Sequence, residues 1–339
     1  MKQVLYIASL NTKKEKYDGE RIKSTFICKI LNEQTNTDII NLSTNKFFKT
    51  LKIFWVGLFK KKKYDYVIIS KDPHGANIIL KLLNFVMFPQ EKIVYFEIGP
   101  FLYDRILNKS IKKETFARTK LIVVETLSMK EELLSIGFDN IDVFPNFKPI
   151  FNISVNHSVY PKDALNLVYL SRIEEQKGIY DLINCLKIIN QDVVKFRLDI
   201  FGRPQSQEDE EKLNVLIKDC DYIKYFGKID INCKESYEAL SKYDLHVFPT
   251  KYSEGFPGTI IDFFIAGVPT LASSFARAND ILTKDDSILF EQFNNKDLIN
   301  KLLYIYTNQH ILTSLRKNSF KRKDEYSTDA FCKYLNRLL

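Results

Sequence analysis

The chain has no long hydrophobic run. Across its 339 residues no stretch reaches about 18 uninterrupted apolar residues, the length that a membrane-spanning helix requires. It starts MKQVLYIASLNTKKEKYDG, with one short apolar run and then charged residues, but without the longer apolar core and small-residue cleavage site of a signal peptide. We therefore expect no membrane span, no secretion signal and a cytoplasmic location.

Cysteine and histidine are also scarce. The five cysteines are an odd number and form no CxxC pair, which favours reduced, mostly buried thiols over a disulfide framework or a zinc site. The four histidines are scattered and form no HExxH motif or other metal-ligand spacing. The sequence therefore predicts no metal site and no cofactor.

Two kinds of nucleotide-binding signature are missing. No GxGxxG follows the apolar run at 4–9 or the one at 165–171, and a NAD-dependent oxidoreductase or epimerase would need that turn for its pyrophosphate. There is no basic helix-turn-helix or RNA-binding signature either, so nucleic acid is not an expected partner.

The composition supports two folded domains. Hydrophobic residues make up 45% of the chain and charged residues 27%, and a domain takes about 150 residues. The positive charge is unevenly placed: residues 1–150 carry a net +9 and residues 151–339 a net −1. This asymmetry indicates that the first half faces an anionic partner such as a lipid surface, with ordinary solubilising charge as the alternative.

Short apolar runs rich in Val, Ile, Tyr and Phe alternate with longer amphipathic segments. Near-continuous runs of this kind are typical of strands buried on both faces of a parallel sheet. Strands are expected at 4–9, 37–43, 64–70, 92–99, 120–125 and 141–146, and again at 165–171, 195–202, 222–227, 244–250, 268–273 and 287–290. Helices are expected at 19–33, 74–88, 128–137, 178–190, 208–219, 235–243 and 258–266, and throughout the chain after 295.

Two successive arrays of strands and helices predict an α/β protein with two Rossmann-like domains. An Asn-, Ser- and Pro-containing stretch separates them. We predict an N-terminal domain at 1–148, a linker at 149–164 and a C-terminal domain at 165–339, whose last helices can cross back to the first domain. Ligands are expected at the carboxyl ends of the strands, facing a cleft between the domains.

The strongest local signal is KYSEGFPGTIIDFFIAGVPTLAS at 251–273. Glu254 lies in a loop after a strand, and a helix is expected to start near Pro257 because proline is favoured at the first helical position. Asp262 then lies about two turns into that helix. The helix start directs its positive end at the ligand, so the segment predicts a phosphate site with a carboxylate on either side.

A second segment, LNLVYLSRIEEQKGIYDLINCL at 165–186, supplies cations at another strand end. Arg172 follows the strand directly and Lys177 precedes the next helix, where both can neutralise a pyrophosphate. Ordinary surface charge beside two glutamates is the alternative. Weaker signals are Gly202 in FGRP and Gly19 at the end of the 11–19 loop, where backbone can approach a phosphate.

Together the segments LSRIEEQKG, FRLDIFGR, YIKYFG, ALSKYDLHVFPT and EGFPGTIIDFFIAGVPTLAS resemble the donor-binding half of the GT-B glycosyltransferases of family 4. The resemblance covers most of 160–275 and the first half more loosely. It implies transfer of a sugar from a nucleotide diphosphate to a hydroxyl with retained configuration and without a metal.

The resemblance also implies roles for individual residues. Glu254 would contact the hydroxyls of the donor sugar, Asp262 the ribose, and Arg172 and Lys177 the diphosphate. The remaining donor contacts would come from Gly19, Gly202, Phe256, Pro257, Gly258 and Thr259.

Two departures from the family pattern concern the second acid and the acceptor side. The second acid is Asp262 rather than Glu, which shortens its reach by one methylene. The histidine that the family often places after the fourth strand is missing from YFEIGP at 95–100, where Glu97 or Gly99 are candidates to replace it. His74 is a third candidate, although capping of the following helix is the favoured interpretation. The missing histidine leaves open a non-catalytic GT-B-like subunit that binds a partner glycosyltransferase.

A basic and aromatic segment at 45–66 points to the acceptor. It combines Phe47, Phe48, Phe54, Trp55 and Phe59 with Lys46, Lys49, Lys52 and the lysines at 60–63. A helix of this kind often lies at a membrane interface, and packing on the sheet is an alternative that can hold at the same time. We therefore expect a lipid-linked saccharide acceptor, as in the synthesis of capsule, O-antigen or exopolysaccharide.

Overall fold

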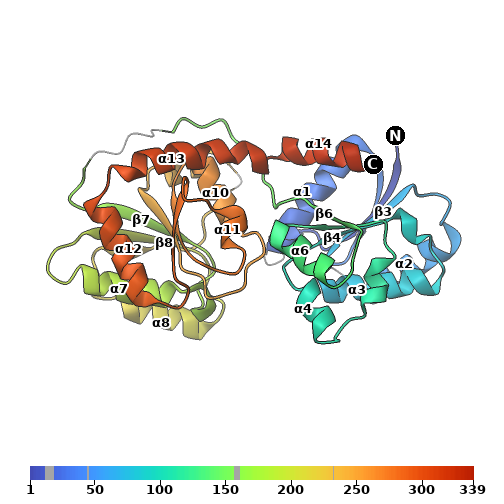
Figure 1. Cartoon of the computed structure of the whole chain (residues 1–339), viewed down its shortest axis with the longest axis horizontal. Helices are drawn as coiled ribbons and strands as arrows, with labels where there is room; N and C mark the ends of the chain where they lie inside the picture. The colour runs from blue at the N-terminus through green and yellow to red at the C-terminus, as the bar shows by residue number, and fades with distance from the viewer. Residues whose placement is uncertain (12–18, 44–45, 156–160, 232) are drawn as a thin grey trace. The chain divides into compact units, whose positions relative to one another are not determined.

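The computed structural model describes residues 1–11, 19–43, 46–155, 161–231 and 233–339 (Figure 1). The chain forms two compact units. The first contains Met1–Lys148 and Thr328–Leu339, and the second contains Pro149–Ser327.

The first unit is built on a six-stranded parallel sheet in the order β2-β1-β3-β4-β5-β6. Its strands are β1 (Gln3–Ala8), β2 (Asn36–Asn41), β3 (Tyr66–Lys71), β4 (Ile93–Glu97), β5 (Leu121–Val124) and β6 (Ile141–Val143). Successive side chains of β1 enter different cores: Leu5 and Ile7 pack in one, and Val4 and Tyr6 pack in the other. This burial on both faces explains the continuous apolar runs in the sequence.

Helices cover both faces of this sheet. They are α1 (Gly19–Gln34), α2 (Lys46–Phe59), α3 (Pro73–Phe85), α4 (Leu102–Leu107), α5 (Lys113–Ala117) and α6 (Leu127–Ser135), with a short 3₁₀ turn, η1 (Gln90–Lys92). The last helix of the chain, α14 (Thr328–Leu338), also belongs to this unit. Its Phe331 stacks on Phe147 with ring centroids 4.2 Å apart and meets the edge of Phe144.

The second unit repeats the architecture with strand order β12-β11-β10-β7-β8-β9, all parallel. Its strands are β7 (Leu165–Leu170), β8 (Phe196–Phe201), β9 (Ile223–Tyr225), β10 (Leu245–Phe248), β11 (Thr270–Ser273) and β12 (Ser287–Phe290). Its helices are α7 (Ile179–Ile189), α8 (Gln207–Ile217), α9 (Lys234–Leu240), α10 (Gly258–Ala266), α11 (Ala278–Ile281), α12 (Asn295–Thr307) and α13 (Ile311–Arg322), with 3₁₀ turns η2 (Glu175–Lys177) and η3 (Lys323–Tyr326).

The stretch expected to be a linker is largely part of the second unit. Ile153 is buried in that unit's core, and Phe151 and Val155 pack against the same core. Residues 156–160 lie outside the described residues. A segment rich in Asn, Ser and Pro can therefore still contribute apolar side chains to a domain core.

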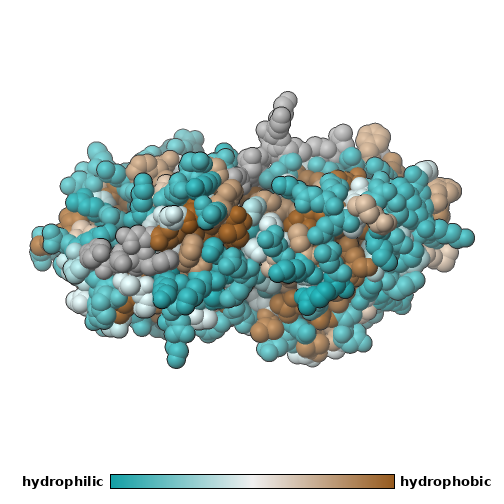
Figure 2. All heavy atoms as spheres, turned by 90° about the horizontal axis from the view of Figure 1, so that it is seen from above, coloured by the Kyte–Doolittle hydropathy of each residue, from teal (hydrophilic) through white to brown (hydrophobic). Residues whose placement is uncertain are grey.

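No helix in the described part of the chain combines the length and apolar character needed to cross a membrane. On the face drawn in Figure 2, hydrophobic side chains lie in small groups among hydrophilic ones. Scattered apolar surface of this kind is normal for a folded protein.

Candidate functional site

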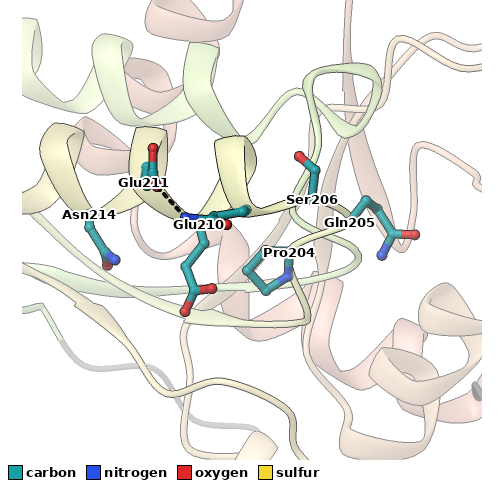
Figure 3. Close-up of a pocket in the computed structure, with 7 residues that line it drawn as sticks. Pro204, Gln205, Ser206, Glu210, Glu211 and Asn214 are labelled. Carbon is teal, nitrogen blue, oxygen red and sulfur yellow. Dashed lines mark hydrogen bonds between the residues drawn. The ribbon is translucent and has the colours of Figure 1, made fainter.

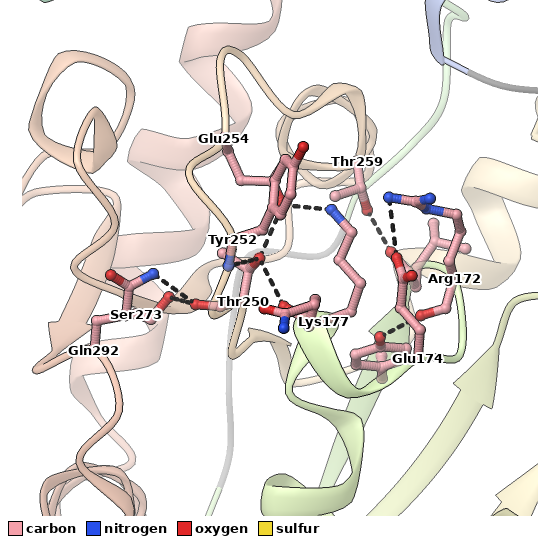
Figure 4. Close-up of polar contacts among 12 residues, drawn as sticks. Arg172, Glu174, Lys177, Thr250, Tyr252, Glu254, Thr259, Ser273 and Gln292 are labelled. Atoms are coloured by element: carbon pink, nitrogen blue, oxygen red, sulfur yellow. Dashed lines mark hydrogen bonds and ion pairs between the residues drawn. The ribbon is translucent and has the colours of Figure 1, made fainter. Parts of the chain in front are cut away.

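The site forms where two neighbouring strands of the second unit end. Strands β7 and β10 are paired and parallel, so the loops that follow them leave the sheet at the same edge. The loop after β7 carries Arg172 and Lys177, and the loop after β10 carries Thr250 and Glu254. Figure 4 draws these side chains in one cluster with the start of α10.

Lys177 and Glu254 form the centre of the cluster. The Lys177 ammonium lies 2.5 Å from Glu254 Oε1, and the two side chains are only 9% and 12% exposed. The Thr250 hydroxyl donates to the same carboxylate oxygen at 2.8 Å. The ammonium also lies 5.3 Å from the centre of the Tyr252 ring, within the range of a cation–π interaction. The loop after β10 thus holds the lysine through its carboxylate and its aromatic ring.

A glycine allows the loop after β7 to come this close to the loop after β10. Gly178 has φ +72°, and a Cβ there would lie 1.9 Å from the carbonyl oxygen of Pro249, at the end of the neighbouring strand. The two loops are also joined by the Lys251 amide, which donates to the carbonyl of Gln176 at 2.8 Å. Only glycine fits at position 178, and this fixes the preceding Lys177 opposite Glu254.

Arg172 lies on the same loop but is more open. Its guanidinium is paired with Glu174 at 3.0 Å, and its side chain is 53% exposed. Its carbonyl accepts from the Tyr169 hydroxyl at 2.7 Å, and burial holds the pKa of that phenol well above its usual value. The backbone of Arg172 is therefore held in place by a hydrogen bond, whereas its guanidinium is accessible to solvent.

Gly202 supports this loop from the next strand. Its φ is +152°, and a Cβ there would lie 1.7 Å from the carbonyl oxygen of Ser171. Its amide donates to the carbonyl of Gly227 at 2.8 Å. The glycine selected in the sequence as a phosphate contact therefore has a packing role beside Arg172.

The start of α10 also lies in the cluster. Pro257 is the residue before the helix and Gly258 its first residue, in agreement with the helix expected at 258–266. The Thr259 hydroxyl donates to the carbonyl of Leu170 at 2.9 Å, which ties the helix to the end of β7. Phe256 is buried against Tyr326. The side chains of Phe256 and Thr259 thus stabilise the fold around the site.

Asp262 lies deeper than expected. It is 1% exposed, and its Oδ1 accepts from the hydroxyl of Tyr237 on α9 at 2.8 Å. Burial, together with this carboxylate, raises the pKa of Tyr237 well above its usual value. In this arrangement the Asp262 side chain is shielded from solvent.

The acceptor-side candidates lie in the first unit and have structural roles there. Glu97 is 1% exposed, and its Oε1 accepts from the amides of Phe101 and Leu102 at 3.1 and 2.8 Å, so it caps α4. Gly99 follows in the same turn with φ +80°.

The capping role expected for His74 is wrong. Asp72 caps α3 by accepting from the Gly75 amide at 3.1 Å, because its side chain precedes the helix. His74 is an exposed residue in the first turn of α3. Gly19 is exposed at the start of α1, and the rest of the predicted phosphate loop at 12–18 lies outside the described residues.

The sequence did not single out several residues that position the site. The carbonyl of Thr250 accepts from the Ser273 hydroxyl at 2.6 Å and from the Gln292 side chain at 3.1 Å. Buried Arg277 donates to the Ser253 hydroxyl at 3.3 Å. Thr250 could have been found as a polar residue directly after a strand, but no local pattern marks the other four.

Two further features of the structure bear on ligand binding. A surface pocket beside the start of α8 is lined by Pro204, Gln205, Ser206, Gln207, Glu210, Glu211 and Asn214 (Figure 3). Its charged side chains are carboxylates, which repel a phosphate. Within the ranges that the structure describes, no three His, Cys, Asp or Glu side chains gather in a way that could hold a metal ion.

Comparison with known proteins shows what the chain is similar to. Residues 164–308 match the sequence profile of the glycosyl transferases group 1. A Klebsiella pneumoniae protein described as an uncharacterized 41.2 kDa protein in the cps region is 22% identical over 302 residues, covering 85% of this chain and 76% of that protein.

Solved structures match the whole chain. HepE from Anabaena, in complex with UDP and glucose, has a TM-score of 0.71 at 12% identity, covering 100% of this chain and 99% of HepE. Sucrose-phosphate synthase from Thermosynechococcus elongatus has a TM-score of 0.75 at 14% identity, covering 100% and 98%. The lipopolysaccharide outer core galactosyltransferase WaaB has a TM-score of 0.66 at 16% identity, covering 95% and 98%. The predicted GT-B fold with two Rossmann-like units and the resemblance to group 1 glycosyltransferases are confirmed.

Proposed function

Since residues 164–308 carry a group 1 glycosyltransferase domain within a chain of the GT-B fold, we propose that this protein transfers a sugar from a nucleotide diphosphate, UDP or GDP, to a hydroxyl. The observation that carries the proposal is the pairing of Lys177 with Glu254 at the start of α10. It places a cation, a carboxylate and a helix N-terminus at one sheet edge. These are the groups that a sugar diphosphate requires.

The cations would bind the diphosphate. Lys177 has three N–H donors, so an ammonium that gives one to Glu254 retains two for phosphate oxygens. Arg172 can exchange Glu174 for a phosphate because its guanidinium is exposed and held by a single short ion pair. Glu254 keeps one carboxylate oxygen, Oε2, for hydroxyls of the donor sugar.

Transfer breaks the bond between the anomeric carbon and the diphosphate oxygen, which leaves with both electrons. The acceptor hydroxyl forms the new bond to that carbon, and its proton passes to the departing diphosphate oxygen. Charge develops on the leaving diphosphate, where Lys177, Arg172 and the positive end of α10 stabilise it. We propose that these groups replace a metal ion and, by resemblance to the family, that configuration is retained.

For Asp262 we propose a positioning role. The residue is 1% exposed, and its carboxylate accepts from the Tyr237 hydroxyl at Oδ1. Asp262 thus holds α9 against α10, whose N-terminus is part of the site.

For the acceptor we propose a lipid-linked saccharide used in surface polysaccharide synthesis, reached from the cytoplasmic face of a membrane. The positive charge of residues 1–150 and the basic aromatic segment at 45–66 support a lipid partner. The similarity to a protein of a cps region and to a lipopolysaccharide galactosyltransferase supports the polysaccharide class.

The proposal is tested first by calorimetric titration with UDP, GDP and NAD. Binding of UDP or GDP supports a transferase, whereas preference for NAD would indicate an oxidoreductase. A screen of nucleotide sugars against a lipid-linked acceptor, with products identified by mass spectrometry and anomeric configuration by NMR, then tests transfer and retention. Nucleotide binding without transfer in any combination would favour a non-catalytic subunit.

A further inference from the structure

An apolar surface of the first unit stands apart from its cores. Helix α2 carries five large apolar side chains that are between 44% and 69% exposed: Phe48, Leu51, Trp55, Leu58 and Phe59. At about 100° per residue these five fall within one third of the helix circumference. The opposite face, with Ile53 and Val56, is buried in the core. Packing on the sheet therefore uses one face of α2 and leaves a second apolar stripe outside.

The end of α3 extends this stripe. Phe85 and Met87 are 77% and 80% exposed. The Phe85 ring lies 6.2 Å from that of Phe54 on α2, and the Lys61 ammonium donates to the carbonyl of Met87 at 3.2 Å. The two helix ends thus form one patch, here called the α2–α3 surface, defined by Phe48, Leu51, Trp55, Leu58, Phe59, Phe85 and Met87.

The sequence of α2 and of the lysine run after it contains no acid, although Lys63 of that run pairs with Asp38. Asp38 and Asp65 are the nearest acids in sequence on either side of α2, and no acid follows Asp72 before Glu91. Lysines are frequent over the same stretch, at positions 49, 52, 60–63 and 81. The Lys60 ammonium lies 4.7 Å from the centre of the Trp55 ring, so positive charge borders the apolar stripe directly.

We propose that the α2–α3 surface docks on an anionic lipid bilayer. Exposed aromatic and aliphatic side chains would enter the boundary between headgroups and acyl chains, and the lysines would bind the anionic headgroups. A second copy of the chain fits poorly, because a twofold contact through this surface would place its lysines against the same lysines. Docking would bring the enzyme to a lipid-linked acceptor, and in this respect it rests on the proposed function.

The chain offers its own probe for this surface. Trp55 is its only tryptophan, so intrinsic tryptophan fluorescence reports on the α2–α3 surface alone. We expect a blue shift of emission on adding vesicles of phosphatidylcholine with phosphatidylglycerol, and quenching by brominated acyl chains. Pure phosphatidylcholine vesicles should give a much smaller change, and high salt should weaken the effect because it screens the lysines.

Two pairs of variants separate the apolar and charged contributions. Leu51→Gln with Phe59→Gln should reduce vesicle partitioning by at least about tenfold, whereas Val215→Gln, at a 74% exposed position on α8 of the second unit, should leave it unchanged. Lys52→Gln with Lys62→Gln should also weaken it by about tenfold, whereas Lys296→Gln with Lys317→Gln removes the same charge from the second unit and should have little effect.

Calorimetric binding of UDP or GDP is measured on every variant and should not change, so failure of the donor site and failure of the docking surface are distinguishable. The proposal is overturned if the intact chain does not bind anionic vesicles at low salt, or if the α2 variants bind as well as their controls. Self-association without vesicle binding, seen by light scattering and abolished by Leu51→Gln with Phe59→Gln, would assign the surface to a second copy instead.

Discussion

Lys177 and Glu254 are 77 residues apart in sequence, yet the ammonium of one lies 2.5 Å from the carboxylate of the other. Both side chains are almost completely buried. The contact exists because β7 and β10 are neighbours in the sheet and Gly178 lets their loops meet. The pair therefore lies at the carboxyl ends of parallel strands, where ligands bind in open α/β sheets.

Lys177→Ala and Glu254→Gln should each lower the rate of sugar transfer by about 10²–10³-fold. Lys177 stabilises the charge that develops on the leaving diphosphate, and Glu254 holds Lys177 in place and binds hydroxyls of the donor sugar. Rates are measured with the donor found in the screen, and folding is checked by circular dichroism. Lys234→Ala is the matched control, since Lys234 forms an exposed ion pair with Glu238 outside the cluster. Activity within twofold of the unmodified protein in both site variants would contradict the assignment.

Gly178→Ala should lower the free energy of unfolding by about 1–3 kcal/mol and weaken nucleotide binding. The added Cβ meets the Pro249 carbonyl, and the positive φ strains any residue with a side chain. Urea unfolding and calorimetry measure the two effects. Gly19→Ala is the control for the stability measurement alone, because a Cβ at the start of α1 meets nothing within 4 Å. Equal effects of the two substitutions on stability would exclude the proposed contact.

Tyr237→Phe should destabilise the protein by about 1–3 kcal/mol, because it leaves the buried Asp262 carboxylate without the hydroxyl that donates to Oδ1. The comparison is Tyr306→Phe, whose hydroxyl donates to the carbonyl of Asp163 in an exposed position and should cost less than about 0.5 kcal/mol. The midpoints of urea unfolding of the two variants measure this difference in stability. If Tyr237→Phe preserves stability but weakens nucleotide binding, Asp262 contacts the ligand rather than holding α9.

Stability should fall at mildly acidic pH through His246. This residue is completely buried between Phe263 and Thr270, and desolvation holds its pKa well below 6.5. Below about pH 6.5 the His246 imidazole binds a proton in the unfolded chain but stays neutral in the folded chain. The free energy of unfolding should therefore drop by about 1 kcal/mol between pH 7.5 and 5.5.

His246→Gln should remove that part of the pH dependence, whereas His310→Gln, at an exposed position, should leave it in place. Free energies of unfolding at the two pH values provide the measurement. The same slope in the His246 variant as in the unmodified protein would show that other groups cause the acid sensitivity.

In the described part of the chain, each of the twelve strands overlaps the apolar run that predicted it. The reason is that parallel sheets covered on both faces impose a continuous local pattern, as in VLYIA of β1 and LNLVYL of β7. The candidate residues Arg172, Lys177 and Glu254 were also readable, because charged residues directly after buried strands must lie at the carboxyl edge of the sheet.

Other features depended on partners that are distant in sequence. The sequence around Asp262 predicts a helix near a ligand. In the structure, the hydroxyl of Tyr237 on another helix donates a hydrogen bond to Asp262 Oδ1. Glu97 looked available for an acceptor, whereas two amides of the following turn occupy its Oε1. A sequence shows which residue types are present but not which neighbour has already satisfied them.

The sequence by itself determined the alternation of strands and helices, the two parallel sheets and the placement of cations and a carboxylate at strand ends, since these follow from local periodicity and from the direction of parallel strands. Only the tertiary structure decided that Lys177 meets Glu254, that Asp262 turns to Tyr237 and that α2 keeps an apolar stripe outside the core. Those outcomes depend on which elements become neighbours, and burial and hydrogen-bond partners are set by that packing rather than by the order of residues along the chain.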